Sequence, residues 1–194
     1  MTPLSDSHAI GLRCAMALAV APETQVRHGV NTHAVMNLLN RCNGTEDAPT
    51  REELIARLAD YLAAIHRVGG GPLVALSSLG QLVRSYAAMR YFMADAIEPR
   101  IDCAEERFRL RTEQAAAMAA FLQHSIDSLI SGFVPRIHFS VHTRAWWRVE
   151  LSLTISHLPD RECIPPSGWS RLSDGSGFRR SALFSARTVS LTPQ

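Results

Sequence analysis

The segment that decides the fold covers residues 50–131 and opens with TREELIARLADYLAAIHRVGGGP (50–72). Leucine, isoleucine and valine recur in these opening residues at the spacing of a buried helix face, with charged residues off that face. Thr50 and Glu53 have the spacing of a capping box, which predicts that the helix starts at Thr50. The glycine run before Pro72 predicts its end, because glycine adopts left-handed backbone conformations and proline cannot continue the hydrogen-bond ladder. These glycines do not fit a phosphate-binding loop, which needs a preceding strand and a following lysine.

Apolar periodicity predicts four more helices, over residues 34–42, 73–86, 87–98 and 102–131. Ser5, Asp6 or Ser7 can cap another, N-terminal helix that ends near Ala21. The helix over 87–98 ends before Pro99, because proline disfavours the helical conformation of the residue that precedes it. The last helix carries apolar residues seven positions apart from Phe108 onward, as a core-facing helix does. Arg107, Arg109 and Arg111 alternate near its start, and the acidic residues around them favour a solvated face over a binding patch.

The period of hydrophobicity changes after Gly132. Ile137, Phe139 and Val141 alternate with polar residues, and residues 148–156 alternate in the same way. Two such runs predict an antiparallel pair of strands that turns through residues 143–146. A two-stranded hairpin is only marginally stable by itself, so its apolar face must pack on the helices or on another chain.

Proline, serine, glycine and arginine dominate after Pro159, which is typical of loops, and a third strand is considered only for residues 185–191. We therefore predict a mainly α fold that is α+β by strict count: an irregular helical bundle, or a short helical-repeat array, with a hairpin and a loop-rich tail. The predicted divisions are a helical domain over 1–132, a β-hairpin packed on it over 133–158, and a loop-rich or disordered basic tail over 159–194. The length of 194 residues suits one domain, or one domain with an appendage.

Charge is distributed unevenly along the chain. Residues 1–132 hold 12 arginines and 14 acidic residues (net −2), whereas residues 133–194 hold 8 arginines and 4 acidic residues (net +4). All 20 basic residues are arginine, which binds phosphate and carboxylate groups in a forked geometry that lysine cannot match. A GC-rich genome produces the same bias, so the arginine content does not by itself indicate nucleic-acid binding.

The most suggestive candidate site is RAWWR (144–148), in which two tryptophans lie between arginines. Tryptophan and arginine are typical anchors of protein interfaces. The same residues can stack on bases and hold phosphates, and a third interpretation is that the indoles simply pack against the hairpin. The candidate binding residues are Arg144, Trp146, Trp147 and Arg148, together with Arg136, Arg179 and Arg180.

The sequence predicts neither a metal site nor a cofactor. His138 and His142 lie four residues apart, which on a strand is roughly 13 Å at 3.3 Å per residue, too far for one ion. No serine-hydrolase elbow, zinc-protease helix, P-loop or dinucleotide-binding glycine pattern occurs. Whether the protein is an enzyme is left open, and the sequence favours a non-enzymatic role.

The four cysteines, Cys14, Cys42, Cys103 and Cys163, form no C-x-x-C pair, which favours a reducing compartment over a zinc knuckle. No apolar run reaches the length of a membrane span, roughly 20 residues. Pro22 follows the short apolar run 14–21 and makes it a poor signal peptide. We expect an intracellular protein, cytoplasmic or organellar, whose oligomeric state the sequence leaves open.

Two similar pentapeptides, IEPRI (97–101) and FVPRI (133–137), stand 36 residues apart, a spacing found in helical-repeat proteins. Residues 53–101, with their succession of helices and a Gly/Pro break, resemble the degenerate repeats of organellar RNA-binding proteins, including the arrays of the FAST-kinase and RAP-domain families. The resemblance concerns the cadence of the helices and matches no base-reading residues. It implies an RNA-binding function.

Three functional hypotheses follow. The first is a non-enzymatic interaction or scaffold module that binds a protein partner within a larger assembly through the basic, tryptophan-bearing hairpin. The second is an RNA-binding helical-repeat protein that uses the same surface. The third is an enzyme whose site is assembled from scattered residues.

Overall fold

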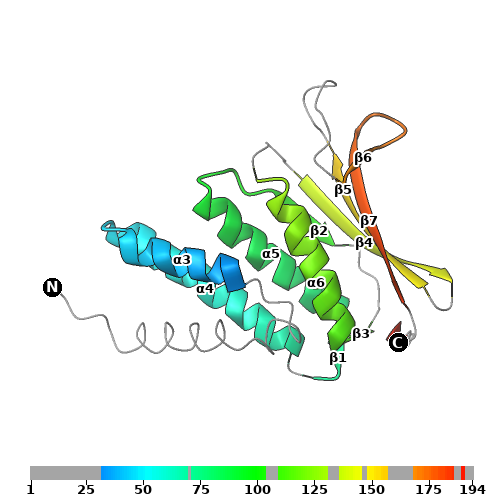
Figure 1. Ribbon diagram of the computed structural model, residues 1–194, viewed down its shortest axis with the longest axis horizontal. Helices are drawn as coiled ribbons and strands as arrows, with labels where there is room; N and C mark the ends of the chain where they lie inside the picture. Colours follow the sequence, from blue (N-terminus) through cyan, green and yellow to red (C-terminus); the bar gives the residue numbers. More distant parts are fainter. Residues whose placement is uncertain are drawn as a thin grey trace.

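The computed structural model describes residues 32–69, 71–103, 109–130, 136–145, 148–156, 168–185 and 189–190. Within these ranges the fold is mixed α+β, as predicted, with helices packed against a sheet (Figure 1). The helices are α3 (Thr32–Gly44), α4 (Ala48–Gly69), α5 (Leu76–Met93) and α6 (Thr112–Asp127). The strands are β1 (Leu73–Ala75), β2 (Arg100–Cys103), β3 (Arg109–Arg111), β4 (Arg136–Ala145), β5 (Arg148–Ser156), β6 (Ser170–Arg171), β7 (Gly177–Ser185) and β8 (Val189–Ser190).

Helix α4 ends at Gly69, as the glycine run predicts, but its cap differs from the prediction. The carboxylate of Asp47 accepts hydrogen bonds from the Thr50 amide (3.0 Å) and from the Thr50 hydroxyl. These hydrogen bonds hold the pKa of Asp47 below its ordinary value of 3.8. Asp47 therefore caps the helix, while Glu53 binds the Arg57 guanidinium one turn later at 2.7 Å.

Helix α5 is one continuous helix where the sequence predicts two, over 73–86 and 87–98. The predicted junction falls at Ala87 and Ala88, and alanine is the strongest helix former, so nothing interrupts the helix there. Asp95, with a left-handed φ of 52°, follows the end of the helix. Residues 73–75 form strand β1 instead of a first helical turn.

The prediction of one long helix over residues 102–131 is wrong. Strands β2 and β3 occupy part of its first third, and α6 starts only at Thr112. Arg109 and Arg111 are exposed while Leu110 between them is buried, which is the two-residue period of a strand. Arg109 and Arg111, interpreted as part of an exposed helix face, were therefore a strand signal, and Arg107 lies outside the described residues.

The main sheet has five strands in the order β2-β4-β5-β7-β6, and Figure 1 shows α5 and α6 on one side of it. β2 and β4 are parallel, and α6 lies between them in the chain. Their register pairs Arg100 with Arg136 and Ile101 with Ile137. The Arg-Ile pairs that end the two similar pentapeptides thus begin neighbouring parallel strands.

The predicted hairpin of β4 and β5 is confirmed: β5 has the predicted bounds, and β4 extends to Ala145, into the predicted turn. The segment predicted as a loop-rich tail contains β6, β7 and β8, and β7 pairs with β5 along its whole length. The apolar alternation of β7 is hard to see in the sequence because Arg180 interrupts it between Phe178 and Ala182. A smaller sheet, β1-β3-β8, lies beside the N-terminal end of α6.

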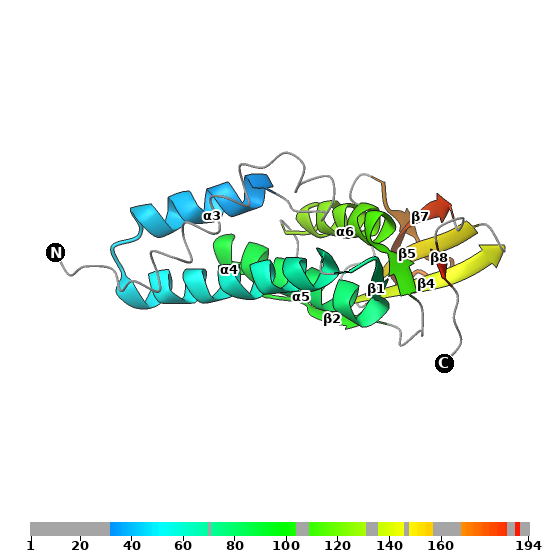
Figure 2. The same ribbon diagram turned by 90° about the horizontal axis from the view of Figure 1, so that it is seen from below.

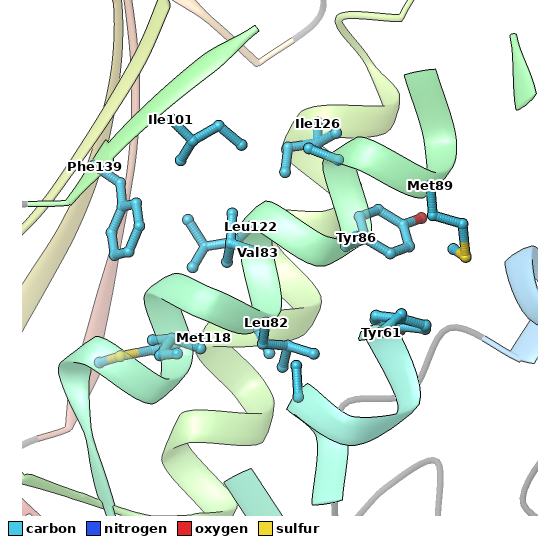
Figure 3. Packing of buried hydrophobic residues seen from close by; sticks show 14 of the residues in the cluster. Tyr61, Leu82, Val83, Tyr86, Met89, Ile101, Met118, Leu122, Ile126 and Phe139 are labelled. Carbon is cyan, nitrogen blue, oxygen red and sulfur yellow. The ribbon is translucent and has the colours of Figure 1, made fainter. Parts of the chain in front are cut away.

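The core lies between the main sheet and helices α4, α5 and α6. Figure 3 shows Ile101 and Phe139 of the sheet pointing toward Val83 of α5 and Leu122 of α6. Figure 2 shows α3 lying along α4 at the end of the molecule remote from the sheet. Arg41 of α3 donates a hydrogen bond to the carbonyl oxygen of Met93 at the end of α5. None of the described helices combines the length and apolar character needed to cross a membrane.

One polar cluster is enclosed by the helices. The Tyr86 hydroxyl donates to the Asp127 carboxylate (2.8 Å), and Arg90 pairs with the same carboxylate at 2.7 Å. Burial, together with Asp127, raises the pKa of Tyr86 well above its ordinary value. Tyr91 is also fully buried, but within the described residues its hydroxyl has no hydrogen-bond partner. Burial raises the pKa of Tyr91 to about 12.

This contrast between neighbouring tyrosines gives a matched test. We expect Tyr86→Phe to lower the free energy of unfolding by about 2 kcal/mol, because it removes a hydrogen bond to a charged group. We expect Tyr91→Phe to raise it by up to about 1 kcal/mol, because it removes a buried hydroxyl that makes no hydrogen bond. Urea denaturation followed by circular dichroism measures both values. A loss of stability in Tyr91→Phe as large as that in Tyr86→Phe would show that the Tyr91 hydroxyl is bonded.

Candidate interaction surface on the main sheet

We call the side of the five-stranded sheet turned away from the helices the outer face. Side chains alternate between the two faces of a strand, and Ile137, Phe139 and Val141 of β4 are fully buried on the helix side. The cross-strand register then assigns the alternate residues of each strand to the outer face. They are Arg100 and Asp102 of β2, Arg136, His138, Ser140 and His142 of β4, Glu150, Ser152 and Thr154 of β5, and Arg179, Ser181 and Leu183 of β7.

The structure brings two of the predicted binding residues together on this face. Arg136 begins β4 and Arg179 lies on β7, and both are exposed. Arg144 and Arg148 belong to the ends of β4 and β5 next to the hairpin turn, where the structure describes the backbone only. Trp146 and Trp147 lie outside the described residues.

Arg180 is not part of the surface. It lies on the helix side of β7, where its guanidinium stacks over the ring of Phe121 at 5.3 Å. Gly168 has a left-handed φ of 82°, and a Cβ atom there would lie 3.6 Å from the same guanidinium. The assignment of Arg180 to the binding set is therefore corrected: its role is to pack β7 and the Gly168 turn against α6.

A shared carboxylate organises the β2 end of the outer face. Asp102 pairs with Arg100 at 3.1 Å and with Arg136 at 3.3 Å, and Arg100 and Arg136 are 70% and 49% exposed. One negative charge between two arginines leaves a net positive charge at this end. Exposed ion pairs of this kind contribute little to stability, so both guanidiniums can exchange Asp102 for a partner's carboxylate at small cost.

The middle of the outer face is polar and closely packed. The Ser140 hydroxyl and His142 Nε2 are 2.8 Å apart, and His142 stands opposite Glu150 in the register of β4 and β5. Serine, histidine and an acid also make up a hydrolase triad. Here, however, Ser140 is only 8% exposed, and the N–H groups of an extended, hydrogen-bonded strand do not converge on one point as an oxyanion hole requires. We interpret the contacts as packing within β4 and between β4 and β5.

The described part of the outer face carries no phenylalanine, tyrosine or tryptophan, and its only rings are the imidazoles of His138 and His142. Phe139, Phe178 and Phe184 all lie on the helix side by their register. Stacking on bases, which sequence-tolerant single-stranded nucleic-acid binding requires, would therefore depend on Trp146 and Trp147.

A pocket lies on the helices. It has a volume of about 380 Å³ and is lined by charged side chains of α4, α5 and the loop before β2. Its central guanidinium, Arg57, is bound by Glu53 at 2.7 Å and by Glu98 at 3.1 Å, and it lies over the Phe92 ring at 4.8 Å. These contacts hold α4, α5 and the loop together, which is a structural role.

The described residues give little support to other chemistry. Among them, no three histidine, cysteine, aspartate or glutamate side chains gather closely enough to hold a metal ion. Cys42 is a buried free thiol whose pKa is raised by burial, which lowers its reactivity.

The chain matches no known family model, and no curated protein is significantly similar to it.

Sequence reasoning missed several members of the outer face. Arg100 and Asp102 were assigned to a helix boundary, and Ser181 and Leu183 to a loop. The signal that could have found β7 is the alternation in GFRRSALFS (177–185), once Arg180 is allowed as an inward-facing residue covered by an aromatic ring.

Proposed function

We propose that the protein is a non-enzymatic interaction module that binds a partner protein within a larger assembly, using the outer face and the adjoining hairpin. The observation that supports this best is the position of Arg136 and Arg179, which are 43 residues apart in the sequence and are both exposed on one sheet face. The candidate residues Arg144 and Arg148 lie at the hairpin end of the same sheet.

The chemistry of the face favours a protein partner over RNA. The accessible part of the face is mixed, whereas its buried part consists of Ser140, Glu150 and Ser152. The exposed or half-buried side chains are those of Arg100, Arg136, Arg179, His138, His142, Asp102, Thr154, Ser181 and Leu183. Mixed polar surfaces with a few arginine and apolar contacts are typical of protein interfaces, whereas a nucleic-acid surface is strongly positive. RNA binding, the function implied by the resemblance to organellar repeat proteins, is the alternative that the experiments must separate.

The test compares two double charge reversals. Arg136→Glu with Arg179→Glu alters the outer face, and Arg109→Glu with Arg111→Glu makes the same change in charge on the smaller sheet. We expect the first variant to retain about tenfold less partner in a quantitative pull-down, corresponding to about 1.4 kcal/mol, and the second to behave like the unmodified chain. Equal retention by the two variants would contradict a role for the outer face.

A further inference from the structure

Within the described residues, strand β7 has one edge that is unpaired over about half of its length. On one side it pairs with β5 from Gly177 to Ser185. On its other side, β6 pairs only with Phe178 and Arg179. No other described strand pairs with this side, so residues 181–185 have an unpaired edge in the part of the chain that the structure describes.

The direction of the backbone groups along this edge follows from two hydrogen bonds. The carbonyl oxygens of Gly177 and Arg179 accept from the Leu172 amide (2.9 Å) and the Ser170 hydroxyl (3.2 Å), both on the β6 side. The N–H and C=O of one residue in an antiparallel strand point the same way, and alternate residues repeat that direction. Ser181, Leu183 and Ser185 therefore direct their N–H and C=O groups outward from the open edge.

This edge lacks the features that keep sheet edges from pairing. Proteins protect exposed edges with charged side chains, proline or bulges. The opposite edge, β2, follows Pro99 and carries Arg100 and Asp102. By contrast, residues 181–185 read SALFS, with no charge and no proline, and Leu183 is 58% exposed.

The open edge is also self-complementary. In an antiparallel pairing about a twofold axis at Leu183, each Leu183 lies opposite its copy, and each Ser181 lies opposite the Ser185 of the other chain. All these pairs are neutral and similar in size, so no like charges meet. A twofold interface requires such self-complementarity, whereas a neutral edge offers nothing that would select a charged partner strand.

We propose that residues 181–185 of β7 pair antiparallel with the same residues of a second copy of the chain, joining the two main sheets edge to edge. The interface uses the main chain of the sheet edge. The partner proposed for the outer face would instead be bound through side chains, although Leu183 belongs to both surfaces.

Sedimentation velocity of the full chain over a range of concentrations tests the pairing. We expect a reversible dimer, and we expect Leu183→Lys to weaken dimerisation at least tenfold, because two lysines would then face each other across the new ladder. The matched control is Ile97→Lys, which makes the same kind of change at a residue 70% exposed in the loop before β2. A chain that stays monomeric, or a dimer equally stable in both variants, would overturn the proposal.

A cross-linking measurement keeps the test valid if Leu183→Lys affects folding. Hydrogen-bonded antiparallel pairs have Cα atoms about 5.5 Å apart, which a disulfide can span. We expect Leu183→Cys to form a covalent dimer under mild oxidation, above the background of the native cysteines, while Ile97→Cys does not. Failure of Leu183→Cys to cross-link in a dimeric chain would place the dimer interface elsewhere.

Discussion

Phe139→Ala is expected to lower the free energy of unfolding by about 4 kcal/mol, the largest loss for any single substitution considered for this protein. Phe139 lies in the middle of β4 and is fully buried between the main sheet and the helices (Figure 3). Its ring reaches Gly80 of α5 so closely that a Cβ added there would be 3.4 Å from the ring. Alanine would leave a cavity between the layers that neither the sheet nor α5 can close by moving a flexible side chain.

Urea denaturation followed by circular dichroism measures this loss, and Phe139→Leu is the matched control. Leucine keeps most of the buried volume, so its expected cost is about 1 kcal/mol. A loss below about 1 kcal/mol for Phe139→Ala would contradict the packing of α5 on the sheet, because a truncated ring in a closed core always leaves a cavity or a strained rearrangement.

Asp127→Ala is expected to cost about 3 kcal/mol, because it removes the common partner of Tyr86 and Arg90. Asp127 ends α6 and both partners belong to α5, so its carboxylate joins the two helices. The Arg90 and Asp127 side chains are 24% and 27% exposed, so solvent compensates only part of the lost interaction. The expected loss of unfolding free energy is therefore at the low end of the range for breaking a buried ion pair.

Two further variants separate the charge from the hydrogen bond in the same urea experiment. Asp127→Asn retains an acceptor for the Tyr86 hydroxyl and loses the ion pair, so it should cost less than Asp127→Ala. Asp60→Ala removes an exposed carboxylate from α4 and should change stability by less than about 0.5 kcal/mol. If Asp127→Ala had an effect as small as Asp60→Ala, the cluster would not hold α5 to α6.

The sequence identifies those elements whose signals are local. The glycine run fixes the end of α4, and the alternation from Ile137 onward identifies β4 and β5. The helix predicted over 102–131 failed because β2 and β3 have only four and three residues, too short for a two-residue period to outweigh the helical pattern after Thr112. Strand β7 was not predicted, for a different reason. Arg180 breaks the alternation of apolar residues in the sequence, and its position on the core face is possible only because its guanidinium stacks on the ring of Phe121 of α6.

In the candidate site, too, some features have a local sequence signal and others depend on how the strands pair. The arginines were found from sequence because residue type alone suggests binding. Their grouping could not be predicted, because it depends on the pairing of β7 with β5, which places Arg179 on the same face as Arg136 and leaves Arg180 on the other. The likeness of the two pentapeptides was visible in the sequence, but only the parallel pairing of Arg100 with Arg136 gives it a structural meaning.

The proposal that the main sheet and its hairpin bind a protein partner is tested most directly by a native pull-down of the full chain, divided into nuclease-treated and untreated halves. We expect the same protein partner from both halves. We also expect that replacing Trp146 and Trp147 with alanine abolishes its recovery while the circular dichroism spectrum stays unchanged. Partners that disappear with nuclease would instead indicate RNA binding. A chain recovered without any partner from both halves, or a partner retained by the double alanine variant, would contradict the account.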